Sequence, residues 1–384
     1  MINRVFLIIV DSLGIGGARD AELFGDKGSN TLGAIRNSDK FFTPNLQKLG
    51  LFNIDGVGGG VSSPIASFAR LVEKSAGKDT TLGHWEISGI VSKTPLPTYK
   101  NGFPNEIISE FERLIGTKTL CNKPYSGTEV IKDYGEIHLK TGYPIVYTSQ
   151  DSVFQIATHD KIVPIEKLYF YCEKARELLT GENSVGRVIA RPFTGEYPFT
   201  RTAYRRDYSL VPPKKTFLDD IKNNSKSVIS VGKINDIFAG VGVTDKIKTL
   251  SNKDGYDKVL ELLNNDFNGL CFVNFVDFDS VYGHRNDVHG YANELSNFDK
   301  FLGEFISGMK DDDLLIITAD HGCDPSTPST DHSRENVPLL IYNKNFKSQN
   351  LGEILGFDCI AETILSSLNI NKGEYGVDLY KKLV

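Results

Sequence analysis

Three short apolar segments, far apart in the chain, lead into acidic residues. They are Val5–Val10 before Asp11, Cys271–Val276 before Asp277 and Asp279, and Leu314–Thr318 before Asp320. Continuous apolar runs of this length are typical of strands that are covered on both faces, as in a parallel sheet. The carboxyl ends of parallel strands share one edge of the sheet, where ligands commonly bind. The sequence therefore predicts a sheet edge at which carboxylates are concentrated.

The rest of the chain alternates between strand-like and helix-like patterns. Helical spacing of apolar residues runs through Ile165–Thr180 and Asn293–Met309. Four further apolar runs predict strands: Ile145–Thr148, Val185–Ala190, Ser227–Val231 and Val337–Tyr342. This alternation predicts an α/β fold with a mainly parallel central sheet flanked by helices.

Length and proline placement predict two domains. A chain of 384 residues exceeds what a single compact core normally holds. Prolines cluster at Pro95 and Pro97 and again at Pro212-Pro213, and such clusters suit exposed hinges. We predict a smaller inserted α/β cap domain over residues 96–214 and a catalytic core made of 1–95 and 215–384. The alternative is that the prolines mark ordinary loops within one domain.

Charge is distributed unevenly along the chain, whose formal net charge is −6. Residues 187–215 contain seven basic and two acidic side chains, a local charge of +5. An arginine-rich region on an acidic protein suits a bound phosphate, although a solvated surface is the simpler interpretation for any single arginine. The chain has no long basic block that would indicate nucleic acid.

No apolar stretch approaches the ~20 residues needed to span a bilayer, so we expect no membrane partner and a cytoplasmic location. The five cysteines are scattered singly, which predicts small buried apolar residues rather than disulfides or a cysteine zinc site. Gly14-Ile15-Gly16 is followed by Arg19 where a dinucleotide-binding fingerprint needs a third glycine, so we do not expect a redox enzyme that binds a dinucleotide. The Gly56–Gly60 segment predicts a flexible loop. The sequence leaves the oligomeric state open.

Histidines accompany the acidic strand ends. His284 follows Asp279 by five positions, His321 adjoins Asp320, and His332 lies eleven residues further on. A mixed Asp/His set suits Zn²⁺ or Mn²⁺ better than Ca²⁺, and six candidate ligands are about right for two ions. Each residue alone has a simpler interpretation, because strand-end aspartates often cap helices and single histidines are usually structural. His138, His159 and His289 are predicted to be structural.

A candidate nucleophile lies in the segment Gly77–Glu86. It places Thr80 and Thr81 directly after Asp79, where a helix N-terminus would favour a phosphate group. Two metal ions can activate a threonine hydroxyl, which is otherwise a poor nucleophile. A threonine-rich helix cap without chemistry explains the spacing equally well.

Taken in order along the chain, these motifs resemble the phosphopentomutases of the alkaline phosphatase superfamily. The shared segments are Asp11–Gly16, Gly77–Thr80, Gly83–Glu86, Asp277–Asp279, Gly283–Arg285, Thr318–Gly322 and Thr330–His332, with Asn122–Pro124, Ser126–Glu129, Tyr147–Ser149, Asp151–Val153 and Gly186–Phe193 between them.

The resemblance implies an alkaline-phosphatase-like core and interconversion of ribose 1-phosphate with ribose 5-phosphate, and of the 2-deoxyribose pair. It implies a phosphothreonine enzyme, a pentose 1,5-bisphosphate intermediate, two Mn²⁺ ions and activation by a sugar bisphosphate such as glucose 1,6-bisphosphate. Residue by residue, it implies Thr80 as the phosphorylated residue, Asp11, Asp320 and His321 on one ion, Asp279, His284 and His332 on the other, and Ser149, Asp151, Val153, Arg187, Arg201 and Lys233 at the substrate.

Three segments depart from the family pattern: Leu82 replaces a hydroxyl residue, Arg201–Asp207 lacks the usual Pro-Asn, and the loop at Gly195–Phe199 is short. Two rival functions stay open. One is a metal-dependent phosphatase or another phosphomutase of the same superfamily, which release of inorganic phosphate would reveal. The other is an inactive sugar-phosphate-binding protein, which would bind ligands without turnover.

Overall fold

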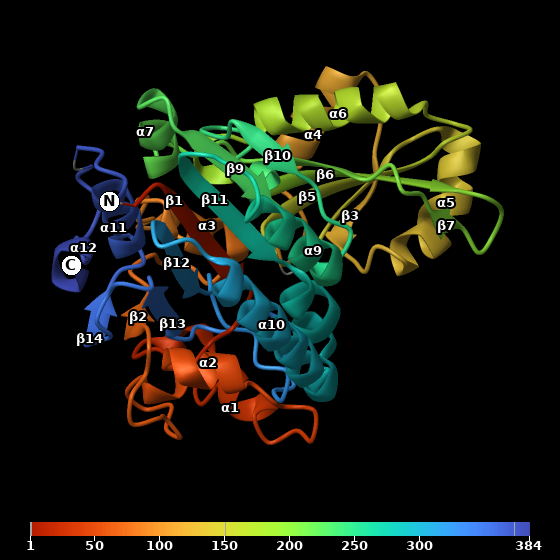
Figure 1. Ribbon diagram of the computed structural model, residues 1–384. Helices are drawn as coiled ribbons and strands as arrows, with labels where there is room; N and C mark the ends of the chain where they lie inside the picture. The colour runs from red at the N-terminus through yellow and green to blue at the C-terminus, as the bar shows by residue number, and fades with distance from the viewer. Residues whose placement is uncertain (1, 150, 372) are drawn as a thin grey trace. The chain divides into compact units, whose positions relative to one another are not determined.

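The computed structural model describes residues 2–149, 151–371 and 373–384. The chain divides into two compact units. We call residues 1–95 together with 212–384 the main unit, and residues 96–211 the inserted unit. Each unit has its own sheet (Figure 1).

The sheet of the main unit has the strand order β10-β9-β11-β1-β12-β13-β2-β14. Pairing is parallel from β10 through β12 and between β2 and β14, and β13 is antiparallel to both of its neighbours. The strands are β1 (Arg4–Val10), β2 (Ser67–Val72), β9 (Ser227–Val231), β10 (Asp245–Ile247), β11 (Gly269–Phe275), β12 (Asp313–Thr318), β13 (Val337–Tyr342) and β14 (Asn350–Leu355). The prediction of a mainly parallel α/β sheet is confirmed.

The three strands that lead into acidic residues are neighbours at the centre of this sheet. β1 lies between β11 and β12, with Leu7 aligned to Phe272 on one side and to Ile316 on the other. All seven residues of β1 and all seven of β11 are buried, which explains their continuous apolar sequence. Parallel pairing brings the carboxyl ends of these strands to one edge.

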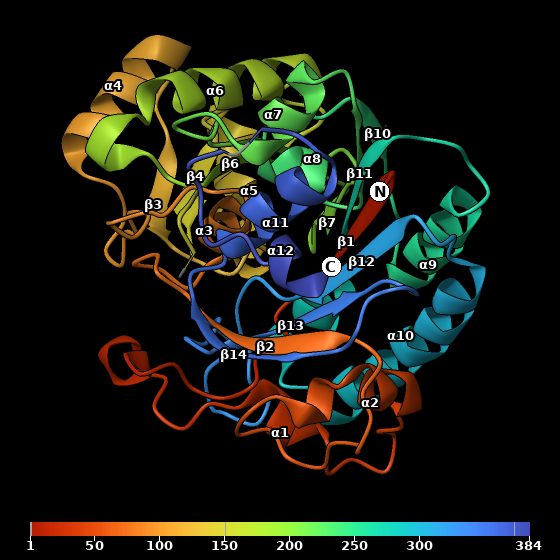
Figure 2. The same ribbon diagram turned by 60° about the vertical axis from the view of Figure 1, so that its left-hand side comes forward.

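Helices cover both faces of the main sheet (Figure 2). One group, which includes α10, α9, α2 and α1, packs on one face, and the group with α3, α7 and α11 packs on the other. The helices are α1 (Thr31–Ile35), α2 (Pro44–Leu49), α3 (Thr80–Ile87), α7 (Phe217–Asn223), α8 (Ile234–Ile237), α9 (Asn252–Leu262), α10 (Val288–Gly308), α11 (Cys359–Ser367) and α12 (Tyr380–Leu383).

The inserted unit is built on a mixed sheet of order β3-β4-β5-β6-β7, with β8 paired to β6. Its strands are β3 (Leu120–Pro124), β4 (Ile145–Thr148), β5 (Val153–His159), β6 (Arg187–Thr194), β7 (Thr200–Arg201) and β8 (Arg206–Ser209), and its helices are α4 (Asn105–Ile115), α5 (Glu129–Thr141) and α6 (Ile165–Leu178). Helices α4 and α6 bury their apolar residues with Phe154 and Val188 of the sheet in one core cluster.

His138 and His159, predicted to be structural, are both buried in the inserted unit. His138 is fully buried on α5, where its Nδ1 donates to the Tyr143 carbonyl over 2.7 Å. Its Nε2 accepts from the backbone N–H of His159 over 2.9 Å, so the ring is held in one neutral tautomer. Burial lowers the pKa of His138 below its usual value.

This lowered pKa predicts that the stability of the inserted unit depends on pH. The unfolded state binds a proton near pH 6.5 whereas the folded state does not, so stability should fall as pH drops through that value, by at most about 1.4 kcal/mol per pH unit. Urea unfolding between pH 7.5 and 5.5, followed by hydrogen exchange of β4 and β5, should show this slope. His138→Gln should flatten it, and an equal slope in the variant would assign the effect to another group.

Among the residues described, no helix combines the length and the apolar character that crossing a bilayer requires.

Candidate metal centre

The acidic residues predicted at the strand ends all lie at the same edge of the main sheet. Asp11 directly follows β1, and Asp320 lies two residues after β12. Asp279 lies in a π-helical turn, Phe278–Tyr282, that starts after β11. Asp11, Asp279 and Asp320 are between 0% and 6% exposed. Three carboxylates therefore converge out of reach of water, where uncompensated charges are costly.

One group of candidate ligands comprises Asp11, Asp320 and His321. His321 Nε2 lies 3.6 Å from Asp11 Oδ1 and 3.2 Å from Asp320 Oδ2. The ligand atoms of these three residues lie within 4.8 Å of one another, which is close enough to share one cation.

A second group forms around Asp279. Its Oδ2 lies 3.0 Å from His284 Nε2, and its Oδ1 lies 3.6 Å from His332 Nε2. The His332 ring lies between the other two imidazoles, with centroids 4.0 Å from His321 and 4.8 Å from His284. All six predicted metal ligands are thus brought together within the main unit.

Hydrogen bonds on the far side of two rings set the tautomers needed for metal binding. His321 Nδ1 donates to the Gly322 carbonyl over 3.0 Å, and His284 Nδ1 donates to the Thr330 carbonyl over 2.6 Å. In each ring Nε2 is therefore the nitrogen that faces the carboxylates and would bind a metal ion. A metal-binding histidine typically donates its other N–H in this way.

The three buried carboxylates and the imidazoles beside them shift one another's pKa values. Burial, with Asp320 and Asp279 nearby, raises the pKa of Asp11 well above its usual value. Burial opposes charge on His284, yet its contact with Asp279 raises its pKa to about 12. Without a cation, protons must neutralise this cluster.

Four buried atoms of the candidate ligands also lack hydrogen-bond partners among the described residues: Asp11 Oδ1, Asp279 Oδ1, Asp320 Oδ2 and His332 Nε2. Orphaned oxygen and nitrogen atoms in a buried Asp/His set fit divalent cations.

Neighbouring side chains fix the position of Asp11. Asn274, in β11, donates to Asp11 Oδ2 over 2.8 Å, and the hydroxyl of Tyr291 donates to the Asp11 carbonyl over 3.2 Å. Lys233, the predicted substrate residue after β9, lies close enough for its positive charge to oppose the rise in the pKa of Asp11 that burial causes. The sequence patterns gave no sign of Asn274 or Tyr291, because each lies inside an apolar run or a helix.

Thr80 is the first residue of α3, and its Oγ1 lies 3.2 Å from His321 Nε2. Asp79 caps the helix by accepting from the N–H groups of Thr81 and Leu82. Thr80 is partly exposed, whereas Leu82 is fully buried. Leu82, which departs from the family pattern, is therefore a core residue. The positive end of the helix dipole favours a phosphate at Thr80.

Close packing of α3 against the Asp320 segment holds Thr80 in this position. A side chain at Gly83 would come within 2.1 Å of the Asp320 carbonyl oxygen, so glycine permits the approach. His84 Nδ1 lies 2.9 Å from the Thr80 carbonyl and 3.2 Å from Asp320 Oδ2. The Gly83-His84 pair thus couples the nucleophile candidate to a candidate ligand.

Gly83→Ala is expected to lower the rate of the reaction at Thr80 about a hundredfold, because displacing a reacting group by about 1 Å lowers a rate by that factor. The added methyl must push α3 away from the Asp320 backbone. Steady-state kinetics with saturating metal would measure the loss. Thr81→Ala, on the same helix, is the control and should stay within a few-fold of wild type; equal activity of the two variants would contradict the packing argument.

Residues near His332 anchor the loop before Thr80. Arg334 Nη1 donates to the Gly77 carbonyl over 2.5 Å, and Lys78 pairs with Asp26 at 2.9 Å. Asp26 also accepts from the backbone N–H of Arg334 over 2.8 Å. Sequence reasoning missed Arg334 and Asp26. Their only signal was the position of Arg334, two residues after a candidate ligand.

Four of the five predicted substrate residues of the inserted unit lie at or near the ends of β4, β5 and β6, and the fifth lies on β7. Arg187 lies 3.6 Å from Asp151 and is aligned with Val153 across β5 and β6. The partly exposed Ser149 directly follows β4. Arg201 lies on β7, aligned with Phe193, and its Nε donates to the Gly127 carbonyl over 3.3 Å. Arg187 also lies 3.7 Å from Asp207, the carboxylate with which Arg205 pairs.

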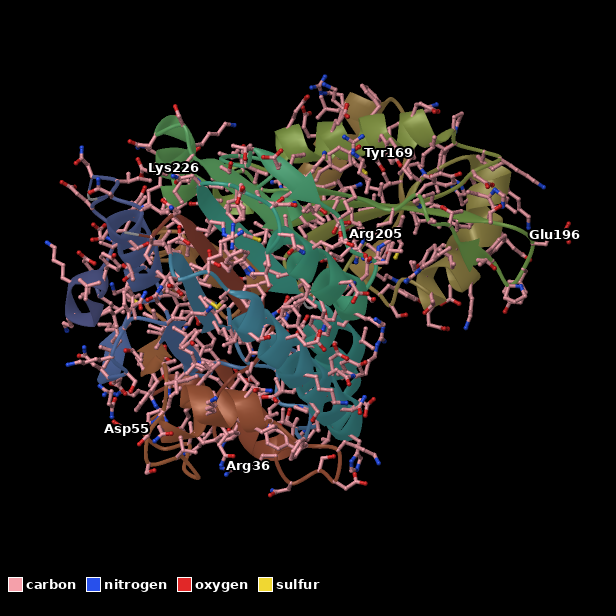
Figure 3. All side chains as sticks on the ribbon, in the orientation of Figure 1. Arg36, Asp55, Tyr169, Glu196, Arg205 and Lys226 are labelled. Carbon is pink, nitrogen blue, oxygen red and sulfur yellow. The ribbon has the colours of Figure 1, made fainter. Side chains whose placement is uncertain are left out.

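Further basic residues surround Arg201. Arg191 and Arg205 lie close enough to the buried Tyr147 to act on its pKa, and Arg205 (labelled in Figure 3) pairs with Asp207 at 2.7 Å. Burial lowers the pKa of Arg191 to about 10, because the charged guanidinium is partly desolvated. This electropositive region belongs to the basic segment predicted from the sequence.

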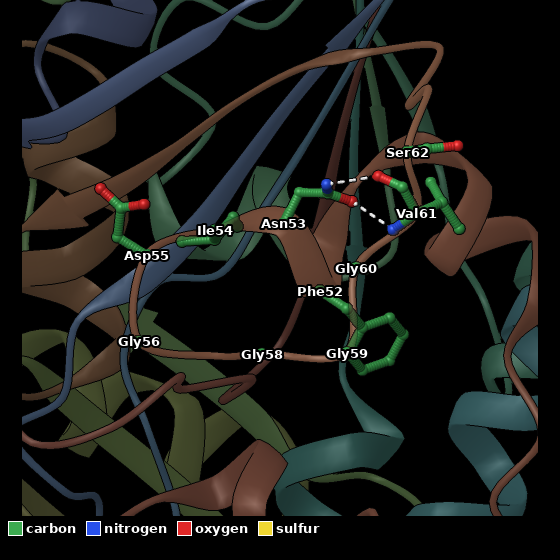
Figure 4. Close-up of a pocket in the computed structure, with 10 residues that line it drawn as sticks. All are labelled: Phe52, Asn53, Ile54, Asp55, Gly56, Gly58, Gly59, Gly60, Val61 and Ser62. Atoms are coloured by element: carbon green, nitrogen blue, oxygen red, sulfur yellow. Dashed lines mark hydrogen bonds between the residues drawn. The ribbon is translucent and has the colours of Figure 1, made fainter.

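A separate cavity of about 520 Å³ in the main unit is lined by residues 52–56 and 58–62 (Figure 4). At its wall, the Asn53 side chain donates to the Val61 carbonyl over 2.8 Å and accepts from the Val61 N–H over 3.0 Å. Arg36 donates to the Val57 carbonyl over 2.9 Å. The glycine loop predicted here is thus tied by side chains, and no candidate ligand lines the cavity.

Comparison with known proteins agrees with this fold and site. A solved structure, the PH0037 protein from Pyrococcus horikoshii, shares the fold with a TM-score of 0.52 at 16% identity, covering 98% of this chain and 99% of that one. A model of the Metalloenzyme superfamily matches residues 3–372, so the protein is a metalloenzyme of that superfamily and depends on divalent metal.

Two relatives narrow the class. The phosphopentomutase of Lachnoclostridium phytofermentans is 58% identical, with 96% of each chain covered, and that of Acetivibrio thermocellus is 55% identical, with 98% of each covered. The chain belongs to the phosphopentomutase family.

Proposed function

We propose that this protein interconverts ribose 1-phosphate and ribose 5-phosphate, and the 2-deoxyribose pair, through a phosphothreonine at Thr80 and a pentose 1,5-bisphosphate. The observation that carries the proposal is the contact of 3.2 Å between Thr80 Oγ1 and His321 Nε2, inside a buried Asp/His cluster. A threonine that served only to cap a helix would not require a buried Asp/His cluster beside its hydroxyl.

In this proposal the six candidate ligands hold two Mn²⁺ ions. Asp11, Asp320 and His321 would hold one, and Asp279, His284 and His332 the other. Such a pair neutralises the phosphoryl oxygens and activates a hydroxyl at neutral pH. A mixed O/N set is compatible with Mn²⁺.

Thr80 alternates between two states in this proposal. As phosphothreonine it transfers its phosphoryl group to the free hydroxyl of the sugar phosphate, which then carries two phosphates. The Thr80 oxygen next attacks the other phosphate and takes it, and the isomeric monophosphate leaves. The N-terminal end of α3 stabilises the charge on the phosphorylated residue in both steps.

Residues outside the cluster would hold the sugar and exclude water. The inserted unit serves as the cap in this proposal, and Arg187 and Arg201 would bind the phosphate that is not being transferred. Asp151, Ser149 and the backbone at Val153 would meet the sugar, and Lys233 of the main unit would meet its phosphate. Water attack on the phosphothreonine would convert the mutase into a phosphatase.

The test is a coupled assay with ribose 1-phosphate or ribose 5-phosphate, Mn²⁺ and catalytic glucose 1,6-bisphosphate, with inorganic phosphate measured in parallel. Isomerisation without phosphate release, lost on chelation, is expected. Phosphate release without isomerisation would instead make the protein a phosphatase of the same superfamily. Omitting the bisphosphate should slow turnover until phosphothreonine is restored. Fractionation of cells would test the cytoplasmic location, which stays a prediction.

A further inference from the structure

Cys323 lies beside the cluster but has no role in the proposed reaction. It follows Gly322 in the segment after β12, and it is 1% exposed. Its backbone N–H donates to Thr31 Oγ1 over 3.0 Å. The Cys323 sulfur, a carboxylate oxygen of Asp279 and a ring nitrogen of His284 all lie within 4.8 Å of one another.

The two residues that lie beside this thiol, Asp279 and His284, are suited to a metal ion. Asp279 Oδ1 is buried without a hydrogen-bond partner among the described residues. His284 commits its Nδ1 to the Thr330 carbonyl, so Nε2 is the nitrogen that faces Asp279 and is placed to bind a metal ion. The Cys323 sulfur therefore adds a third metal-binding atom to those of Asp279 and His284.

Packing limits how far the thiol can turn away. A side chain at Gly283 would lie 3.0 Å from the Cys323 sulfur, so the sulfur presses against the backbone that carries His284. On its other side, the sulfur lies 3.5 Å from the Asp331 carbonyl. Both neighbours belong to segments that supply candidate ligands.

We propose that Cys323 is a soft ligand that, with Asp279 and His284, binds a thiophilic divalent ion such as Zn²⁺, Co²⁺ or Cd²⁺. The thiol proton passes to solvent when the sulfur binds, and the thiolate bonds to the ion without any change of oxidation state. Ions that prefer oxygen and nitrogen, such as Mn²⁺, would use only the Asp/His ligands. Cys323 thus ranks the metals that compete for this half of the site.

This inference deepens the proposed two-ion site, but its test needs only protein and metal. Full-length protein is stripped with a chelator and titrated with Co²⁺. Wild type should develop a thiolate-to-cobalt charge-transfer band in the near ultraviolet, and X-ray absorption of the Zn²⁺ form should show a sulfur neighbour at about 2.3 Å. Because no sugar phosphate is added, failure of the mutase assay leaves this test unaffected.

Cys323→Ser should lose the band and bind Cd²⁺ at least about tenfold more weakly, since even indirect supports of a ligand contribute that much. Cys271→Ala is the matched control, because Cys271 is fully buried in β11, and it should keep both signals. A wild-type protein that binds Co²⁺ without the band, or a Cys323→Ser variant that retains it, would overturn the proposal. If Cys323→Ser does not fold, the absorption measurement on wild type decides alone.

Discussion

Thr80→Ala is expected to lower mutase turnover by about four orders of magnitude or more, the loss usual when a catalytic nucleophile is removed. The hydroxyl oxygen near His321 is the atom that would carry the phosphoryl group. Metal binding should persist, because the six candidate ligands are untouched. Turnover is measured in the coupled assay, and bound metal by elemental analysis of the same preparation.

The control for this variant is Thr81→Ala, which removes the neighbouring hydroxyl while its backbone N–H still donates to Asp79. Its turnover should stay within a few-fold of wild type. Incubation with a labelled sugar bisphosphate should label wild type and Thr81→Ala but leave Thr80→Ala unlabelled. Label on the Thr80 variant would falsify the assignment of the nucleophile.

Asp279→Asn and Asp320→Asn are each expected to lower turnover about a thousandfold, since a bound divalent ion contributes several kcal/mol to such a transition state. Each substitution keeps the side-chain volume but removes a buried negative charge from one ligand group. Each variant should retain about one equivalent of Mn²⁺, whereas wild type should bind two if the proposed two-ion site is correct. Equilibrium dialysis measures both numbers, and chelation should abolish wild-type activity reversibly.

Asp299→Asn provides a matched control, because Asp299 is also buried in the main unit but accepts hydrogen bonds from Asn45 and Leu46. It should alter stability while both equivalents of metal remain bound. Two full equivalents in Asp279→Asn, at wild-type affinity, would remove Asp279 from the ligand set.

The sequence predicted the central strands well because burial on both faces leaves a clear signal. The predicted strands at Ile145–Thr148, Ser227–Val231 and Val337–Tyr342 match β4, β9 and β13 residue for residue. Other boundaries shifted: the strand predicted over Val185–Ala190 is Arg187–Thr194, and the helix predicted from Asn293 starts at Val288. The residues added at these boundaries, 191–194 in the strand and 288–292 in the helix, mix polar and apolar side chains, so hydrophobic pattern alone does not mark the boundaries.

Antiparallel pairing of β13 could not be predicted from the sequence, because a strand buried on both faces reads alike in either direction. The interpretation of the cysteines was partly right: four are buried as small apolar residues would be, and Cys121 is half-buried. What the pattern could not show is that one of them, Cys323, lies among candidate ligands. Loops bring residues together without a periodic pattern in the sequence, so this proximity could not be predicted from hydrophobic periodicity.

The placement of β1 between β11 and β12 governs the order in which a newly synthesised chain can fold. Arg4 pairs with Gly269 and Asp313, so the first strand finds its neighbours only after most of the chain exists. At about 5–20 residues per second, a ribosome needs roughly 15–65 s to travel from Asp11 to His332. The inserted unit, being one continuous stretch, can fold during that interval. The apolar first strand must meanwhile remain unpaired, which makes this stage of synthesis the one most exposed to aggregation and most dependent on chaperones.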